Sequence, residues 1–191
     1  MDKKLCQEDK IILLSVAREA IIHVTQGMAL PEIDLSSQSV ELVENGASFV
    51  TLHRKNDGKL RGCIGTLEPY QPLIIDVQYH AIAAALEDYR FPPVTYEEVS
   101  NLSIEISRLT SPISLEYSNP SELPGLLNPG IDGVIIRDEH RKATFLPQVW
   151  EQLPEPELFL EHLCRKMGTK DDLWKKKLLK VSIYQVEEFH E

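Results

Sequence analysis

The sequence is poor in cysteine, with three residues among 191, at positions 6, 63 and 164. An odd number of widely separated cysteines argues against the disulfide framework that holds many small secreted domains together. No apolar run approaches the ~18–20 residues that a membrane-spanning helix needs. The amino-terminal Met1-Asp2-Lys3-Lys4 leads into an amphipathic stretch that Arg18 and Glu19 interrupt, unlike the continuous apolar segment of a signal peptide. We therefore expect a cytoplasmic protein that does not bind membranes.

Cations are also scarce, because 20 Lys and Arg residues face 30 Asp and Glu residues and the formal net charge is −10. Long-range repulsion of phosphates argues against extensive wrapping by nucleic acid. One stretch, between residues 165 and 180, has more cations than anions. Its basic residues are Arg165, Lys166, Lys170, Lys175, Lys176, Lys177 and Lys180. This stretch could bind a phosphate or an acidic partner locally, although a solvated face is the plainer interpretation.

Several motifs that carry known chemistries are missing. The chain has no Gly-x-x-x-x-Gly-Lys-Ser/Thr, Gly-x-Gly-x-x-Gly, His-Glu-x-x-His or Gly-x-Ser-x-Gly segment, and no cysteine cluster for an iron–sulfur centre. Asp76 and His80, followed by Glu87, share one edge of an expected helix and could place two metal ligands side by side. Polar residues at this spacing are more typical of the wet edge of an apolar helix. The sequence therefore predicts no cofactor and no metal site.

The apolar residues, 42% of the chain, follow helical and strand periodicities in turn. Helices are predicted over residues 8–28, 40–44, 72–87 and 157–167, and Thr95 with Glu98 could form a capping box for a short turn. An Asp-Gly turn between β-rich runs predicts a hairpin of 48–53 with 59–64. Further strands are predicted at 102–107, 134–136, 143–146 and 179–186. Strands joined mostly by hairpins predict an α+β fold, a largely antiparallel sheet covered by helices, as one domain over residues 1–191 with a larger and a smaller lobe.

The most function-like segment is Leu60-Arg61-Gly62-Cys63-Ile64-Gly65. In a strand, Arg61 and Cys63 point to the same face, and a guanidinium beside a thiol favours the nucleophilic thiolate. Gly62 and Gly65 would let a ligand or another backbone approach closely. Alternatively, Cys63 packs as a small apolar side chain and the glycines mark a bulge.

A second constellation, Asp88-Tyr89-Arg90-Phe91-Pro92-Pro93, follows the predicted central helix. Asp88 and Arg90 could line a cleft, or they could form an ion pair that fixes the aromatic–proline corner. Glu105, in the alternating strand 102–107, is either a solvent-facing carboxylate or a covered one that needs a cation such as Arg61 or Arg90.

Taken in order, these segments resemble the AMMECR domain family, whose bacterial and archaeal members are called AmmeMemoRadiSam system protein A. The resemblance covers almost the whole chain, most clearly from about Phe49 to Trp174. It is carried by Phe49-Val50-Thr51-Leu52, the Leu60–Gly65 segment, the Asp88–Pro93 segment, Ile104–Ser107, Gly130–Val134, Phe145–Val149 and Lys166–Gly168. The resemblance implies an antiparallel sheet with helices and a smaller lobe. Some members carry His where this chain has Asp132, so no imidazole function is transferred to that position.

The family name reflects an association with Memo-like proteins and radical SAM enzymes, which implies a pathway without identifying a reaction. Our main hypothesis is therefore an accessory protein that binds such partners through the Arg61–Gly65 surface. The resemblance adds Phe91, Pro92, Pro147 and Gln148 to that surface.

The alternative hypothesis is an enzyme that uses Cys63 as a nucleophile or redox thiol, with Arg61 stabilising the thiolate. In that case Asp88, Arg90 or Glu105 would assist with proton transfer or with substrate charge.

Overall fold

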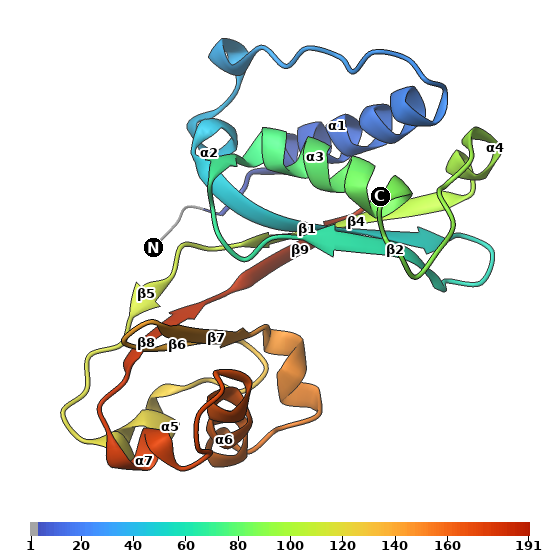
Figure 1. Ribbon diagram of the computed structural model, residues 1–191. Coiled ribbons are helices and arrows are strands. Elements are labelled where there is room, and N and C mark those ends of the chain that lie inside the picture. The colour runs from blue at the N-terminus through green and yellow to red at the C-terminus, as the bar shows by residue number, and fades with distance from the viewer. Residues whose placement is uncertain (1–3) are drawn as a thin grey trace. The chain divides into compact units, whose positions relative to one another are not determined.

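The computed structural model describes residues 4–191, and Met1, Asp2 and Lys3 of the amino-terminal segment lie outside the described residues. The chain forms two compact units (Figure 1). The first contains the described residues up to Leu109 together with Glu187–Glu191, and the second contains Thr110–Val186. Helices and open antiparallel sheets confirm the α+β class.

The first unit contains a five-stranded sheet in the order β2-β1-β4-β9, with β3 paired to β1. Its strands are β1 (Asn45–Arg54), β2 (Leu60–Gly65), β3 (Gln71–Pro72), β4 (Leu102–Leu109) and β9 (Val186–His190). The predicted β1–β2 hairpin is confirmed. Its turn uses Gly58 at a φ of 65°, in the left-handed region that glycine adopts without steric cost.

Helices α1 and α3 of this unit lie on one side of its sheet (Figure 1). The helices are α1 (Gln7–Thr25), α2 (Val40–Val43), α3 (Leu73–Leu86) and α4 (Tyr96–Val99), with a 3-10 turn η1 (Leu35–Ser37). A capping box of Cys6 and Asp9 starts α1, and one of Thr95 and Glu98 starts α4. The second box was predicted from the sequence.

Strand alternation gives this sheet two distinct faces. Val50 and Leu52 of β1 and Ile104 of β4 are fully buried in the same core as residues of α1 and α3. Because side chains alternate along a strand, Thr51 and Glu105 lie on the opposite face. Cys63, which pairs with Thr51, lies there too.

The second unit contains a four-stranded sheet in the order β5-β8-β6-β7. Its elements are β5 (Ile113–Ser114), η2 (Pro120–Glu122), α5 (Leu123–Leu126), β6 (Gly133–Asp138), β7 (Arg141–Phe145), η3 (Pro147–Glu151), α6 (Pro156–Lys166), α7 (Leu173–Lys176) and β8 (Lys180–Tyr184). Trp150 stacks on Phe159 in its core, with ring centroids 3.7 Å apart. The chain leaves α6 through Gly168, at a φ of 77°.

The strand predicted over residues 179–186 is confirmed over Lys180–Tyr184, but it does not continue unbroken to Val186. The segment divides at Gln185 into β8, which belongs to the second sheet, and β9, which belongs to the first. At the division Thr110 N–H donates to Gln185 O, and Gln185 N–H donates to Thr110 Oγ1. Side-chain alternation alone cannot reveal this change of sheet, because β8 and β9 have the same two-residue period and differ in the strands with which they pair.

Candidate functional site

Cys63 lies in a row of polar side chains that crosses three strands. It pairs with Thr51 in β1, and Thr51 pairs with Glu105 in β4. All three side chains are half-buried on the face opposite α1 and α3. The Thr51 hydroxyl donates to Cys63 Sγ at 3.4 Å. The thiol is therefore partly exposed and has a polar neighbour.

The Asp88 carboxylate is buried and accepts four hydrogen bonds. Its donors are Cys63 N–H at 2.9 Å, Arg90 N–H at 3.2 Å, Arg90 Nε at 2.9 Å and Arg90 Nη2 at 2.6 Å. The side-chain hydrogen bond from Arg90 is the main cause that holds the pKa of Asp88 well below its usual range. Asp88 is thus an ionised carboxylate that connects the strand to the corner after α3.

The Arg90 guanidinium bonds to Asp88 and to the backbone of Cys63. The hydrogen bond to Asp88 is the main cause that raises the pKa of Arg90 above its usual value, and the charge of the Asp88 carboxylate adds to this shift. Arg90 Nη2 also donates to the Cys63 carbonyl at 3.3 Å. Its side chain is 44% exposed, so part of the guanidinium is accessible to a ligand or partner.

Arg61, the cation predicted to stabilise the Cys63 thiolate, is paired with a carboxylate. Its buried guanidinium forms a fork with Glu98 of α4, with Nε–Oε1 at 3.0 Å and Nη2–Oε2 at 3.1 Å. These bonds are the main cause of the lowered pKa of Glu98, which also accepts from Thr95 N–H. The pairing register of β1 with β2 shifts between Leu52 and His53 and skips Arg61, so the alternation on which the prediction relied is interrupted at this residue. Its partner Glu98 lies 37 residues further along the chain.

The Phe91 ring contacts both arginines, with Arg61 Cζ 6.0 Å and Arg90 Cζ 5.6 Å from its centroid. Backbone bonds close the corner around it, from Phe91 N–H to Asp88 O and from Val94 N–H to Ala85 O. Tyr89, at the tip, is 95% exposed. The sequence allowed two interpretations of this segment, a cleft lining or an ion-paired corner. The structure shows the ion-paired corner.

Comparison with known proteins gives the family. The AMMECR1 family model matches residues 14–189. This chain belongs to the AMMECR1 family. It is 35% identical to Protein MK0488 of Methanopyrus kandleri over 100% of this chain and 92% of that one. It is 39% identical to Protein MJ0810 of Methanocaldococcus jannaschii, covering 98% of this chain and 92% of that one.

A solved structure has the same fold as this AMMECR1-family chain. The crystal structure of the uncharacterised protein PH0010 from Pyrococcus horikoshii matches with a TM-score of 0.73 and 36% sequence identity. The match covers 94% of this chain and 89% of that one. None of these relatives carries a name that states an activity.

The two glycines of the Leu60–Gly65 segment make close contacts within the protein. A Cβ on Gly62 would lie 2.1 Å from the Ala84 carbonyl oxygen of α3, so Gly62 faces the helix side of the sheet. A Cβ on Gly65 would lie 2.3 Å from the Phe49 ring. The close approach predicted from the motif is thus made by a helix backbone at one glycine and by a side chain at the other.

Asp76 and His80 do not form a wet edge of α3, because both are buried. Asp76 Oδ2 accepts from Ser48 N–H at 2.9 Å and Ser48 Oγ at 2.7 Å, and lies 3.1 Å from His80 Nδ1. The prediction of a solvent-exposed helix edge was wrong because Ser48 of β1 supplies Asp76 with buried hydrogen-bond donors. The sequence of α3 alone does not reveal these donors. Within residues 4–191, no group of three or more His, Cys, Asp or Glu side chains is arranged to hold a metal ion.

Glu105 completes the row across the three strands. In the part of the chain that the structure describes, its carboxylate has no hydrogen bond or ion pair, so neither Arg61 nor Arg90 is its partner.

Pro147 and Gln148 begin the 3-10 helix η3 of the second unit. In the same helix, Trp150 Nε1 donates to the Asp132 carbonyl at 2.7 Å. This bond joins η3, which begins within the Phe145–Val149 segment, to the Gly130–Val134 segment. Both segments carry the family resemblance.

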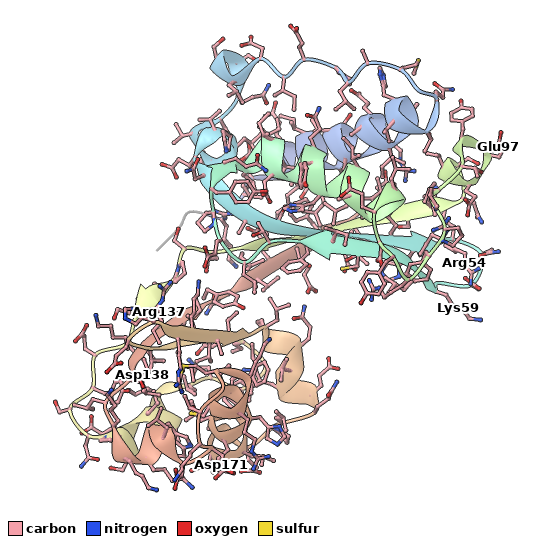
Figure 2. The ribbon with its side chains drawn as sticks, in the orientation of Figure 1. Arg54, Lys59, Glu97, Arg137, Asp138 and Asp171 are labelled. Atoms are coloured by element: carbon pink, nitrogen blue, oxygen red, sulfur yellow. The ribbon has the colours of Figure 1, made fainter. Side chains whose placement is uncertain are left out.

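The basic stretch of the second unit is largely paired. Carboxylates of the same unit contact its cations in the pairs Arg165–Asp171, Lys175–Glu161, Lys176–Asp172 and Lys177–Asp138. Figure 2 labels Asp138 and Asp171 among them. These pairs reduce the positive charge available to a phosphate. No helix in the described part of the chain is long and apolar enough to cross a membrane.

Proposed function

We propose that this AMMECR1-family protein is an accessory protein that binds a partner protein through the Arg61–Gly65 surface and the Asp88–Pro93 corner. The observation that carries the proposal is that an exposed residue, Tyr89, directly follows a buried and firmly hydrogen-bonded one, Asp88. Asp88 is buried and accepts four hydrogen bonds, whereas Tyr89 is 95% exposed. A preorganised surface loses little conformational freedom on binding.

The residue types at the tip suit a protein interface. Tyrosine and arginine are enriched among the residues that contribute most to binding energy. Tyr89 and Arg90 are adjacent and exposed, and Phe91 is half-buried beneath them. The charged groups of the site are already engaged, Arg61 with Glu98 and Asp88 with Arg90. They are therefore better suited to hold a shape than to transfer protons.

The partners we propose are the Memo-like and radical SAM proteins associated with this family. Binding of the purified full chain to each is measured by calorimetry. Tyr89→Ala should weaken binding at least tenfold, as expected for a residue of this kind at the centre of an interface. Tyr79→Ala, which removes a 51% exposed tyrosine from the middle of α3, is the control and should bind normally. Absence of binding to either class of partner, or equal affinities of the two variants, would contradict the proposal.

A second candidate function is supported by the environment of Cys63. The thiol is partly exposed and accepts a hydrogen bond from Thr51, and the Arg90 guanidinium donates to the carbonyl of the same residue. An enzyme with Cys63 as nucleophile or redox thiol is therefore the alternative, with Arg90 rather than Arg61 as the supporting cation.

Native alkylation followed by mass spectrometry tests this alternative. Under it, Arg90→Gln slows iodoacetamide labelling of Cys63, because a neighbouring cation favours the reactive thiolate. Exposed Cys6 and buried Cys164, whose pKa is raised by burial, are internal controls. If Cys63 labels at the same rate in both proteins, or only after unfolding, the thiol function is excluded.

A further inference from the structure

A cavity of about 560 Å³ lies in the first unit, and its lining includes none of Cys63, Thr51 and Glu105, the residues of the Cys63 row. Its volume falls within the roughly 300–1,000 Å³ that is typical of small-molecule sites. Residues from α1, the end of the β1–β2 hairpin, α4 with its following turn and the residue after β9 line it. They are Arg18, Ile22, Lys55, Tyr96, Glu97, Val99, Ser100 and Glu191. Figure 2 labels Glu97 on α4, and Arg54 and Lys59 on the neighbouring hairpin.

Arg18 is held in the cavity with one edge of its guanidinium directed at a carboxylate. Nη1 donates to Val99 O at 2.8 Å, and Nη2 donates to Leu102 O at 2.7 Å. These two carbonyls fix the plane of the group. The Nε and Nη2 edge then binds Glu191 as a fork, with Nε–Oε1 at 2.9 Å and a second contact from Nη2 to Oε2. Planar, bidentate recognition of this kind is typical of arginine with carboxylates.

The other walls supply a second cation and apolar surface. Lys55 Nζ donates to Ser100 O at 3.1 Å and keeps two further protons for other acceptors. Ile22 is half-buried, Val99 is buried, and the Tyr96 side chain is 48% exposed. Glu97 is the second anion of the lining and disfavours a doubly charged guest such as a phosphate.

We propose that this cavity binds a small organic carboxylate, which replaces Glu191 on Arg18 and packs its apolar part against Ile22, Val99 and Tyr96. Glu191 thereby acts as a competing carboxylate of the chain itself. Helix α4 links the cavity to the Leu60–Gly65 strand, because its Glu98 holds Arg61 while its Tyr96 and Val99 line the cavity. The carboxylate site does not depend on the accessory function proposed above.

The test is a titration of the nitrogen-labelled full chain with 3-phenylpropionate, followed by two-dimensional NMR. The backbone amides of Ser100, Leu102 and Ile104 report on the cavity. We expect saturable shifts at these amides with the carboxylate, and none with the uncharged 3-phenylpropanamide. Phenylphosphate should bind more weakly than the carboxylate.

Glu191→Gln separates this proposal from adventitious binding. The variant keeps the shape of the side chain but removes the competing charge. If Glu191 occupies Arg18 for about nine-tenths of the time, its neutralisation tightens binding about tenfold. Arg18→Lys, which removes the fork, should weaken binding at least tenfold in the same Glu191→Gln background.

Three results would overturn the proposal. They are equal binding of acid and amide, shifts confined to amides outside the cavity, and an affinity that Glu191→Gln does not increase. Tighter binding of phenylphosphate would reject the carboxylate as the preferred ligand class.

Discussion

At the scale of single residues, Asp88 determines how the Leu60–Gly65 strand and the corner after α3 are joined. One buried carboxylate accepts from the backbone of Cys63 and from both the backbone and the side chain of Arg90. Such hydrogen bonds to an ionised group are among the stronger ones in proteins. The position of the thiol and of the exposed tip therefore depends on the charge of this one residue.

We predict that Asp88→Asn lowers the free energy of unfolding by about 2–3 kcal/mol near pH 7. Because the pKa of Asp88 is lowered in the folded protein, its contribution is complete above the unfolded value of about 3.9. The contribution is lost progressively as the pH falls below that value towards the folded pKa. Urea unfolding of both proteins between pH 3 and pH 7 measures the difference. A difference that stays constant down to pH 3 would contradict this account.

Gly62 is the second residue that determines local packing, because there is no room for a side chain at its position. We predict that Gly62→Ala destabilises the protein by about 2–3 kcal/mol, because the new methyl group would overlap the Ala84 carbonyl, which is backbone and cannot move aside alone. Gly125→Ala is the control, since a Cβ there meets nothing within 4 Å. The control should change the unfolding free energy by less than about 0.5 kcal/mol in the destabilising direction. Similar losses in the two variants would show that steric overlap at Gly62 is not the cause.

At the scale of elements, the short helix α4 has more influence than its four residues suggest. Glu98 closes the capping box with Thr95 and pairs with Arg61, while the neighbouring residues line the Arg18 cavity. A helix of one turn is not stable by itself, so these tertiary contacts must hold it in place.

We predict that Glu98→Gln lowers the unfolding free energy by about 1–2 kcal/mol, because it leaves the buried Arg61 guanidinium without its anion. The loss is moderate because solvent partly screens the pair at its Glu98 end. Glu97→Gln, one residue away and exposed, should stay within about 0.5 kcal/mol of the wild-type protein. Thermal and urea unfolding of the three proteins measure this. Equal effects of the two substitutions would mean that the pair with Arg61 contributes nothing to stability.

The helices and strands also show which features local sequence patterns can predict. The hairpin around Gly58 and the capping box of α4 follow from local period and spacing, and were predicted. The pairing of Arg61 with Glu98 was not predicted, because it depends on where a distant element packs.

Two other failures have the same origin. Asp76 has the spacing of a wet edge, yet Ser48 from β1 supplies it with buried donors. The division between β8 and β9 is likewise decided by partner strands, which the alternation of side chains does not identify.

At the scale of the whole molecule, the chain builds two apolar cores that share no residue. The first combines α1, α3 and the helix side of the β1–β4 pair, and the second surrounds Trp150 and Phe159. The chain passes from one unit to the other after Leu109 and returns at Glu187. The Cys63 row and the Arg18 cavity are both built entirely from residues of the first unit.

We predict that the two cores control local stability separately. Leu52→Ala should lower the opening free energies of β1 and β4 by about 2–5 kcal/mol, because it leaves a cavity at a fully buried position. Leu163→Ala, equally buried in α6, is its counterpart and should do the same for β6 and β8. Native-state hydrogen exchange reports these energies strand by strand. Equal loss of protection in both sheets from either substitution would instead mean that the chain opens as one cooperative unit.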